Sequence, residues 1–330
     1  MKSFNVAVVG ATGMVGRTIL NILEERNFPI NNLYLFSSSK SAGTRVQFRG
    51  NNYIVEELCD TSFDRKIDIA LFSAGGATSI KYAPIAASKG VIVIDNSSAF
   101  RMDKDVPLIV PEVNESEMYK HNGIIANPNC STIQAVVALK PLHDRYGIKR
   151  IVYSTYQAVS GSGVKGITDL ENGLAGKPNS FYPHPIYNNC LPHIDVFEQN
   201  GYTKEEIKMI EETKKILNDY NLKITATTVR VPVSNCHSEA VNVELDNDFD
   251  LGELKNTLIN SPGIILVDEP EKNLYPLASL ANGKDEVFVG RVRRDESLDY
   301  GINMWIVADN IRKGAATNSV QIAESLIKNM

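Results

Sequence analysis

Apolar and polar positions follow two different patterns in the two halves of the chain. In the first half, five short apolar runs lie at residues 4–9, 33–36, 67–73, 91–95 and 124–126. Helical patterns lie between some of these runs, at residues 15–26 and 80–89. Buried strands that alternate with helices are typical of a parallel sheet covered on both faces. The first half is therefore predicted to form an α/β domain with a Rossmann-type parallel sheet.

The second half has more strands and fewer helices between them. Its predicted strands lie at residues 151–157, 223–229, 240–245, 287–293 and 302–308. This pattern favours an α+β domain built on a mostly antiparallel sheet, with helices on one face. Residues 160–192 are rich in Gly, Pro and Asn, and they are too many for a simple connection. We therefore expect this segment to be functional.

The change of pattern sets the predicted domain boundary. Residues 1–128 form the first predicted domain, and residues 129–311 form the second. A helical pattern over residues 314–328 predicts that the final segment, 312–330, packs back on the first domain. A chain of 330 residues agrees with two domains, since one hydrophobic core rarely serves more than ~250–300 residues.

Composition and charge narrow the class of protein. A hydrophobic content of 43% and a charged content of 22% are typical of a globular protein. The net charge of −5 argues against a nucleic-acid partner and leaves any anionic ligand to local Arg and Lys. The four cysteines lack C-x-x-C or Cys/His ligand spacing, so neither a disulfide framework nor a metal site is expected. No signal peptide precedes the first predicted strand and no apolar stretch could span a bilayer, so we expect a cytoplasmic protein without a membrane partner.

A glycine motif follows the first predicted strand and opens the first predicted helix. Gly10, Gly13 and Gly16 are spaced G-x-x-G-x-x-G rather than G-x-G-x-x-G. Glycines let the backbone approach a pyrophosphate, and the helix N-terminus supplies N–H donors to it. The motif predicts a dinucleotide site, although a tight strand-to-helix turn would use the same glycines.

The loop after the second predicted strand helps to choose the cofactor. Sites for NAD usually carry an acidic residue there, which holds the ribose 2′-hydroxyl. Residues 37–43 instead contain hydroxyl groups and one cation, with no carboxylate. This favours NADP, and a solvated polar loop is the alternative. The expected cofactor-binding residues in this half are Gly10, Thr12, Gly13, Met14, Val15, Ser37, Ser39, Lys40, Ser41, Ser73 and Gly75.

Cys130 stands where polar turn residues give way to an apolar helical stretch. The segment Asn-Pro-Asn-Cys-Ser-Thr, residues 127–132, precedes the apolar residues 133–139. The unpaired N–H groups and the dipole of a helix N-terminus favour a thiolate, which is the reactive form of cysteine. A buried structural cysteine is the alternative. With the glycine motif upstream and the pair Cys236-His237 downstream, the set indicates covalent redox chemistry on an acyl group.

Several motifs together resemble one enzyme family. They are the glycine motif at 10–16, Ser-Ser-Ala-Phe-Arg at 97–101, the cysteine segment at 127–132, Tyr-Gln-Ala-Val-Ser-Gly-Ser-Gly at 156–163, Val-Arg-Val-Pro at 229–232 and Cys-His-Ser at 236–238. The chain resembles the aspartate-semialdehyde dehydrogenases from Gly10 to its C-terminal region. The resemblance implies NADPH-dependent reductive dephosphorylation of L-aspartyl 4-phosphate to L-aspartate 4-semialdehyde, on the route to lysine, methionine and threonine.

The resemblance also assigns catalytic roles. Cys130 would displace phosphate and form a thioester, because an acyl phosphate does not readily accept hydride directly. His237 would be the acid/base catalyst, and Gln157 would orient the acyl group. Without the flanking motifs, a lone histidine at a strand edge or a glutamine at a strand end would be structural.

The remaining implied residues bind the two ends of the substrate. By resemblance, Arg101 binds phosphate and Arg230 binds the α-carboxylate, since guanidinium groups hold such oxyanions in a bidentate way. Glu212 and Lys215 match a Glu-x-x-Lys pair that the family uses at the substrate amine and the phosphate. Asn129 belongs to the same substrate site. Isolated arginines are normally solvated, and the Glu-x-x-Lys spacing is equally typical of a surface ion pair.

The nicotinamide end and the assembly complete the implications of the family. Asn310, Ser160 and Gly161 would line the nicotinamide end of the cofactor site. The family forms homodimers through its second domains, so the expected partners are a second copy of the chain, L-aspartyl 4-phosphate and phosphate.

Four other functions remain open at this point. An N-acetyl-glutamyl-phosphate reductase shares the thioester logic, but its cysteine usually follows Asn-Pro-Gly, whereas Asn129 precedes Cys130 here. A glyceraldehyde-type dehydrogenase would carry Ser-Cys-Thr-Thr, which is missing. A cysteine hydrolase built on Cys130 and His237 would need no nucleotide. A silent NADP-binding regulator would not need the complete set of reactive residues.

Overall fold

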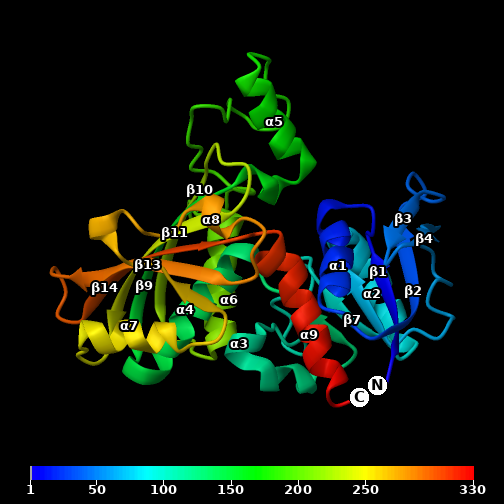
Figure 1. Cartoon of the computed structure of the whole chain (residues 1–330), viewed down its shortest axis with the longest axis horizontal. Helices are drawn as coiled ribbons and strands as arrows, with labels where there is room; N and C mark the ends of the chain where they lie inside the picture. The colour runs from blue at the N-terminus through cyan, green and yellow to red at the C-terminus, as the bar shows by residue number, and fades with distance from the viewer. Residues whose placement is uncertain (1) are drawn as a thin grey trace. The chain divides into compact units, whose positions relative to one another are not determined.

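The structure is a computed structural model that describes residues 2–330. The chain divides into two compact units (Figure 1). The first unit runs to Asn129 and includes Ala315–Met330, and the second unit is Cys130–Gly314. The predicted boundary lies one residue before this division, and the predicted returning segment begins three residues earlier, at 312.

A six-stranded parallel sheet forms the centre of the first unit. Its order is β5-β2-β1-β6-β7-β8, and every adjacent pair is parallel. The strands are β1 (Phe4–Val9), β2 (Ile30–Ser37), β5 (Glu56–Glu57), β6 (Ile69–Phe72), β7 (Ile92–Asp95) and β8 (Ile124–Ala126). The Rossmann-type sheet predicted from the alternating pattern is confirmed.

Both faces of this sheet are covered, which explains why its strands read as continuous apolar runs. All six residues of β1 are buried. Val6 and Val8 pack with α1 (Met14–Glu25), whereas Ala7 and Val9 point to the opposite face and pack with α2 (Gly76–Ser88). Successive side chains of a strand point to opposite faces, so one short strand contributes to two apolar cores.

The last helix of the chain belongs to the first unit. After a π-helical turn at Arg312–Ala316, α9 (Thr317–Ile327) packs against α1. Its apolar side chains Val320, Ile322, Ala323 and Leu326 join the core that contains Val6 and Val8. The rest of this unit comprises a hairpin of β3 (Arg45–Phe48) and β4 (Asn51–Ile54), α3 (Pro111–Asn114) and the 3-10 helix Glu115–Lys120.

The second unit is built on a six-stranded mixed sheet of order β10-β9-β11-β14-β13-β12. Its strands are β9 (Ile148–Gln157), β10 (Lys223–Arg230), β11 (His237–Leu245), β12 (Ile264–Leu266), β13 (Val287–Asp295) and β14 (Gly301–Ala308). The three central pairings are antiparallel, and β10 and β12 join the edges in parallel. The mostly antiparallel prediction is confirmed.

Helices cover one face of this second sheet. They are α4 (Cys130–Tyr146), which contacts β9, β11, β13 and β14, α6 (Lys204–Leu217), which contacts β10, and α7 (Leu251–Ile259), which contacts β12 and β13. A capping box begins α6: the Thr203 hydroxyl accepts from the Glu206 N–H, and the Glu206 carboxylate accepts from the Thr203 N–H. Along β11, alternate residues from His237 to Leu245 are buried, so His237 points into the helix-covered core.

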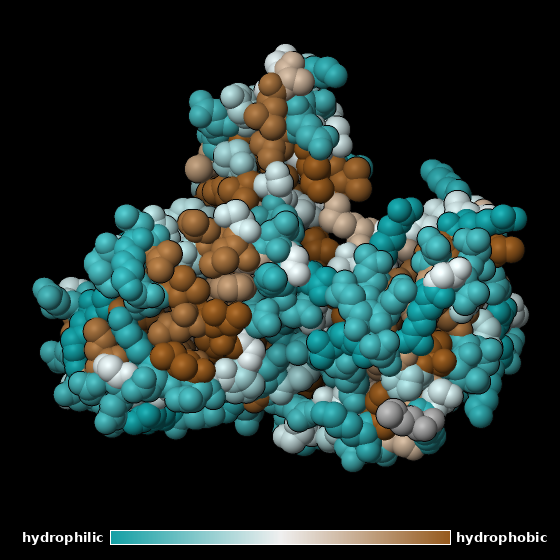
Figure 2. Space-filling view, viewed as in Figure 1, coloured by the Kyte–Doolittle hydropathy of each residue, from teal (hydrophilic) through white to brown (hydrophobic). Residues whose placement is uncertain are grey.

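The opposite face of the second sheet holds a cavity of about 510 Å³. Its lining includes Val152, Ala240, Met304 and Trp305, from three neighbouring strands. Figure 2 shows apolar side chains gathered on the surface of this unit. No helix in residues 2–330 is long and apolar enough to cross a membrane, and no cluster in that range could hold a metal ion.

Residues 160–192 are not an unstructured connection. They contain α5 (Val164–Leu174), which follows the 3-10 helix Val159–Ser162. A small apolar cluster of Val159, Leu170, Ile186 and Leu191 holds this segment together. The Asp169 carboxylate accepts backbone N–H groups of Ser180, Phe181 and Tyr182, which ties the following turn to α5. The remaining short helices of the unit are the 3-10 turn Pro270–Lys272 and α8 (Ala278–Ala281).

Candidate active site

The first unit contains a cavity of about 560 Å³ at the carboxyl ends of β1, β2 and β6. The glycine motif forms part of its wall, and two of its positions, Gly10 and Gly16, have no room for a side chain. Gly10 has φ +85°, and a Cβ on it would lie 2.4 Å from the carbonyl oxygen of Ser73. A Cβ on Gly16 would lie 2.1 Å from the carbonyl oxygen of Gly10. The β1–α1 turn is therefore pressed against neighbouring backbone, as a backbone-built dinucleotide site requires.

Most of the cofactor-binding residues predicted in the first unit line this cavity. They are Gly10, Thr12, Gly13, Ser37, Ser39, Ser41 and Ser73. Four others do not line it: Met14 and Val15 are the first residues of α1, Lys40 is exposed in the loop after β2, and Gly75 precedes α2. The Thr12 and Ser37 hydroxyls lie 2.9 Å apart, which links the glycine turn to the loop after β2.

A carboxylate that the sequence pattern did not predict also lines the cavity. Glu57 belongs to β5, a two-residue strand whose partner in the register is Ser37. A strand of two residues has no detectable period, and Glu57 lies twenty positions after Ser37, the first residue of the serine loop. The loop at residues 37–43 therefore has no carboxylate, but the cavity that it lines does have one.

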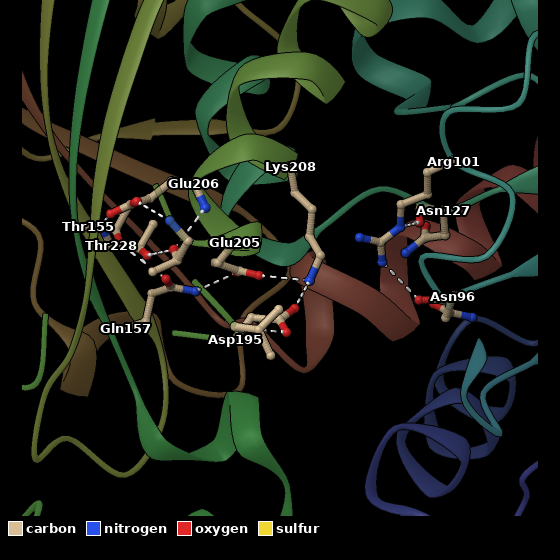
Figure 3. A network of polar contacts seen from close by, with 12 residues as sticks. Asn96, Arg101, Asn127, Thr155, Gln157, Asp195, Glu205, Glu206, Lys208 and Thr228 are labelled. Atoms are coloured by element: carbon tan, nitrogen blue, oxygen red, sulfur yellow. Dashed lines mark hydrogen bonds and ion pairs between the residues drawn. The ribbon is translucent and has the colours of Figure 1, made fainter. Parts of the chain in front are cut away.

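Arg101 is buried in the first unit, with 8% of its surface exposed. Its Nε donates to the carbonyl oxygen of Asn127 at 2.9 Å, and its Nη2 donates to that of Asn96 at 3.0 Å (Figure 3). The Asn127 side chain accepts in turn from Asn318 of α9 at 2.7 Å. Arg101 is thus a fixed cation rather than a solvated surface group. Asn129, two residues after Asn127, is also buried.

Cys130 is the first residue of α4 and is partly exposed. This is the predicted position at a helix N-terminus. A Cβ on Gly314 would lie 2.7 Å from the Cβ of Cys130, so the π-helical turn packs closely against the cysteine. One helical turn after Cys130, the Gln134 amide donates to the carbonyl oxygen of His237 at 3.3 Å. Residues four apart share a helix face, so Cys130 lies on the side of α4 that faces the start of β11.

His237 is completely buried, so it is not a histidine of the solvent-exposed surface. Its Nδ1 accepts the backbone N–H of Ala158 at 3.0 Å, and its Nε2 is buried without a partner among residues 2–330. Burial and then the charge of Arg230 hold the pKa of His237 well below its usual 6.5. The preceding Cys236 has φ +73°, and its N–H donates to the Asn310 side chain at 3.0 Å.

Arg230 lies beside the histidine at the end of β10. Its Nη1 donates to the carbonyl oxygen of Ala158 at 2.6 Å, and 4% of the residue is exposed. A Cβ on Gly161 would lie 2.9 Å from Nη1 of Arg230 and 3.2 Å from Nε2 of His237. The peptide groups of Ala158 thus fix both side chains, and Gly161 leaves the space between them open.

Gln157 is held at both ends of its amide (Figure 3). Its Oε1 accepts from the Thr155 hydroxyl at 3.1 Å, and its Nε2 donates to Oε1 of Glu205 at 3.1 Å. The other oxygen of Glu205 lies 3.2 Å from the Lys208 ammonium, which also lies 2.7 Å from Asp195. Sequence reasoning missed Glu205 and Lys208, because charged residues at i and i+3 of a helix normally indicate a solvated face.

The rest of the predicted set lies in the same unit. Glu212 is 1% exposed, so it is not part of an ion pair on the surface. Lys215 is half-buried. Both continue the stripe that Glu205 and Lys208 begin on α6, at spacings of 7 and 10 residues. Elsewhere in the unit, the buried side chain of Asn310 donates to the Ser160 hydroxyl at 3.0 Å.

Glu239 is a further buried acid that sequence reasoning missed. It is completely buried on β11, and neither carboxyl oxygen has a partner in the described part of the chain. Burial and then the charge of Glu205 raise its pKa well above the usual 4.5. An alternating strand predicts which positions face the core, but it gave no reason to expect an acid at one of them.

The comparisons with known proteins identify the family. The family model for the "Semialdehyde dehydrogenase, NAD binding domain" matches residues 5–121, and that for the "Semialdehyde dehydrogenase, dimerisation domain" matches residues 139–313. An aspartate-semialdehyde dehydrogenase of Aquifex aeolicus is 55% identical over 334 residues, covering 98% of each chain. This chain belongs to the aspartate-semialdehyde dehydrogenase family. It is an enzyme of that family, with a nicotinamide-cofactor domain and a dimerisation domain.

Solved structures of aspartate-semialdehyde dehydrogenases have the same fold. Aspartate semialdehyde dehydrogenase II from Vibrio cholerae, crystallised in complex with ASA, has a TM-score of 0.93 and 49% identity, and 99% of each chain is covered. The enzyme from Candida albicans with NADP has a TM-score of 0.78 and 26% identity, and 98% of each chain is covered.

Proposed function

We propose that this chain reduces L-aspartyl 4-phosphate to L-aspartate 4-semialdehyde and phosphate, through a thioester on Cys130 and with NADPH as the reductant. The reaction supplies the route to lysine, methionine and threonine. One observation carries the proposal: Arg230 and His237 are buried and held by the same residue, Ala158, and the helix that begins at Cys130 contacts the His237 backbone through Gln134. Burying such polar and charged groups costs stability, and a catalytic role explains why the chain keeps them.

The covalent step uses Cys130. Its thiolate sulfur attacks the acyl carbon, a C–S bond forms, and the C–O bond to phosphate breaks as phosphate leaves. When bound, the nicotinamide cofactor supplies the hydride that reduces the thioester carbonyl carbon. The C–S bond then breaks, and Cys130 is restored as the thiolate that its helix N-terminus stabilises.

The charged residues of the second unit fit the amino-acid end of the substrate. Arg230 would bind the α-carboxylate through its guanidinium group, and Glu212 would bind the α-ammonium group. A buried acid at this place favours a free amine over an N-acetylated one, because an amide carries no charge to pair with it. This supports an aspartyl rather than an N-acetyl-glutamyl substrate.

The phosphate end would be held by Arg101, Lys215 and Asn129. Arg101 suits this role because backbone carbonyl groups fix its guanidinium group, and a fixed planar donor set binds phosphate oxygens well. Gln157 and His237 would act on the acyl group itself, next to Cys130.

The cavity of the first unit fits a dinucleotide. The backbone-packed turn at Gly10 and Gly16 and the N-terminus of α1 would receive the pyrophosphate, and the hydroxyl groups of residues 37–41 would receive the adenosine ribose and a 2′-phosphate. Met14, Val15 and Gly75 would contribute through backbone close to this cavity, and Lys40 through its charge. Ser160, Gly161 and Asn310 would contact the nicotinamide end. The relative from Candida albicans was crystallised with NADP, which supports NADP here.

We further propose that the chain works as a cytoplasmic homodimer. The dimerisation-domain match over residues 139–313 and the partly apolar cavity on the face of the second sheet opposite α4, α6 and α7 support a sheet-based interface. A reducing compartment suits the chemistry, since none of the four cysteines, all of them within residues 2–330, forms a disulfide and Cys130 would act as a thiolate. Sedimentation equilibrium at micromolar concentration tests the assembly, and a fully active stable monomer would refute it.

One assay tests the activity itself. Phosphate-dependent reduction of NADP is measured with L-aspartate 4-semialdehyde and, separately, with N-acetylglutamate semialdehyde. We expect turnover with the first substrate and at most a trace with the second. The reverse preference, or turnover that does not need phosphate, would contradict the proposed function.

A further inference from the structure

Asp309 is a buried carboxylate to which the proposed reaction assigns no role. It follows directly after β14, and 2% of the residue is exposed. Its two oxygens accept hydrogen bonds from four N–H groups, two on each oxygen. A buried carboxylate is costly unless such donors satisfy it. These donors come from segments that are far apart in the sequence, and Asp309 holds them together.

The first oxygen of Asp309 holds the start of the π-helical turn Arg312–Ala316. Its Oδ1 accepts the backbone N–H groups of Ile311 at 2.9 Å and of Arg312 at 3.0 Å. The backbone carbonyl oxygen of Asp309 accepts the N–H of Gly314 at 3.0 Å, a bond that spans the five residues of a π-helix. Three hydrogen bonds to one residue therefore set the position of this turn.

The π-helical turn contacts the cysteine of the reaction centre through Gly314. A Cβ on Gly314 would lie 2.7 Å from the Cβ of Cys130 and 3.2 Å from its Cα. The φ of Gly314 lies outside the left-handed region, so the contact rather than the backbone conformation requires glycine here. A shift of the turn would therefore move the backbone against which Cys130 packs.

The second oxygen of Asp309 holds the turn that leads into β11. Its Oδ2 accepts Nδ2 of Asn235 at 2.9 Å and the backbone N–H of Gly283 at 2.9 Å. Asn235 lies two residues before His237, the first residue of β11. Asp309 therefore contacts the segment that carries the histidine as well as the segment that packs on the cysteine.

This second turn needs support from outside itself. Cys236 has φ +73°, a conformation that residues with a side chain rarely adopt and that persists only where neighbours hold it. The Cys236 N–H donates to the side chain of Asn310, the residue after Asp309, at 3.0 Å. Asp309 and Asn310 thus hold the turn at two successive residues, and His237 follows directly.

We infer that Asp309 is a positioning residue for the reaction: its two oxygens fix the turn that packs on Cys130 and the turn that carries His237 at one relative position. The inference rests on the proposed function, in which both side chains act on the same acyl group. Asp309 takes no part in bond making or proton transfer in this assignment. A displacement of about 1 Å in such a site costs on the order of 10²-fold in rate.

The isosteric amide cannot replace this carboxylate. An asparagine side chain has one oxygen that accepts and one NH₂ group that only donates. Whichever way the amide turns, its NH₂ group faces two of the four N–H donors, and one of the two turns loses its acceptor. Asp309→Asn therefore removes the positioning while it preserves the size of the side chain.

Kinetics of Asp309→Asn test the inference first. We expect kcat with L-aspartate 4-semialdehyde to fall about 10–100-fold at a temperature well below the Tm of the variant. The Kd for NADPH, measured by calorimetry, should change less than about threefold, because the cavity of the first unit does not include Asp309. A wild-type kcat would overturn the inference.

Asp169→Asn is the matched control. Asp169 is equally buried, and its carboxylate accepts the N–H groups of Ser180, Phe181 and Tyr182 and the hydroxyl of Ser180. None of these donors belongs to the two turns that Asp309 joins. We expect kcat to change less than about twofold in this variant. Equal losses of kcat in Asp309→Asn and Asp169→Asn would show a merely structural effect and would overturn the inference.

Alkylation of the cysteines separates displacement from loss of the thiolate. Iodoacetamide modification is followed at each cysteine by mass spectrometry, with the exposed Cys59 as the internal reference. Cys236 should stay unmodified, because burial and then the charge of Asp309 raise its pKa to about 12. We expect the Cys130 rate in Asp309→Asn to stay within about threefold of wild type, since the N-terminus of α4 is unchanged. A rate that falls in parallel with kcat would contradict a positioning role.

Double-mutant cycles test whether Asp309 acts through the two turns. Gly314→Ala should lower kcat about 10²-fold in the wild type, but less than about tenfold in Asp309→Asn, where the turn is already released. Asn235→Ala, which inserts nothing into a packed contact, should lower kcat about tenfold in the wild type and less than about twofold in Asp309→Asn. Losses that multiply in both cycles would show that Asp309 acts independently of these turns.

The tests separate the inference from the proposed function. If the wild type fails to turn over L-aspartate 4-semialdehyde, the proposed function fails. If the wild type is active but Asp309→Asn retains its kcat, or the losses multiply in both cycles, only the inference fails.

Discussion

The candidate nucleotide cavity of the first unit and the candidate reaction centre of the second are built from different materials. The cavity wall consists largely of backbone, glycine and serine, at the ends of adjacent parallel strands. The reaction centre consists of buried polar and charged side chains, each oriented by another group, as Ala158 orients His237 and Glu205 orients Gln157. A backbone-built site depends on small residues at fixed spacing, whereas a side-chain site depends on partners from distant parts of the chain.

The largest expected effect is a loss of turnover that leaves cofactor binding unchanged. Cys130→Ala should lower turnover by more than about 10⁴-fold, because only this thiolate can form the thioester. Binding of NADPH, measured by calorimetry, should remain nearly unchanged, since the cavity of the first unit does not include Cys130. Alkylation of the wild type should modify Cys130 before the other three cysteines. Substantial turnover in the alanine variant would disprove the covalent mechanism.

A glycine within the side-chain site should be nearly as sensitive. Gly161→Ala places a methyl group 2.9 Å from Nη1 of Arg230 and 3.1 Å from Cε1 of His237, so both side chains must move. We expect kcat/KM to fall by roughly 10²-fold, because a displacement of this kind costs about that much in a positioned site. Gly76→Ala, where a Cβ meets nothing within 4 Å, is the control and should leave kcat/KM unchanged. A Gly161→Ala enzyme with normal activity would show that the space beside His237 is not used.

The difference between a backbone-built site and a side-chain site also determines which features could be predicted from the sequence. The glycine turn, Cys130 at a helix start and the strands of both sheets other than the short edge strands β5 and β12 could be predicted, because spacing and hydrophobic period encode them locally. Glu57, Glu205 and Glu239 could not. Their roles depend on which strand or helix lies opposite, and no local pattern distinguishes a buried acid with a function from an exposed one.

The same substitution, arginine to lysine, can be made once in each unit, which allows the two units to be compared directly. Arg230→Lys should lower kcat/KM for L-aspartate 4-semialdehyde about ten- to a hundredfold, since a buried charge-assisted contact contributes roughly 1.5–3 kcal/mol. Arg101→Lys in the first unit should mainly raise the KM for phosphate. Steady-state kinetics with each substrate varied in turn will measure both. If Arg230→Lys alters only the KM for phosphate, the two assignments must be exchanged.

Cofactor choice tests the cavity of the first unit. The wild type should prefer NADPH to NADH, and Ser38→Asp should weaken NADPH binding about tenfold by repelling the 2′-phosphate. Glu57→Gln should strengthen NADPH binding, because it removes the carboxylate that lines the cavity next to Ser37. Equal kcat/KM values for the two cofactors in the wild type would show that the serine loop does not select NADP.

The smallest expected effect concerns stability and the buried acid Glu239. Its folded-state pKa lies well above the usual 4.5, so the folded state holds a proton that the unfolded state releases as pH rises above that value. Stability from this group is therefore complete below pH 4.5 and is lost progressively as pH rises toward the folded-state pKa. Glutamine has the same shape and carries no charge at any pH, so Glu239→Gln removes this loss.

Thermal unfolding as a function of pH measures the effect. The Tm of Glu239→Gln relative to wild type should be higher at pH 8 than at pH 5, and a difference of 1 kcal/mol corresponds to about 2–4 °C in a domain of this size. Glu244→Gln on the same strand, which removes an ion pair with the exposed Lys149, is the control. A Tm difference that stays constant between pH 5 and pH 8 would mean that Glu239 is charged in the folded protein, and that a partner for it forms within the reaction centre.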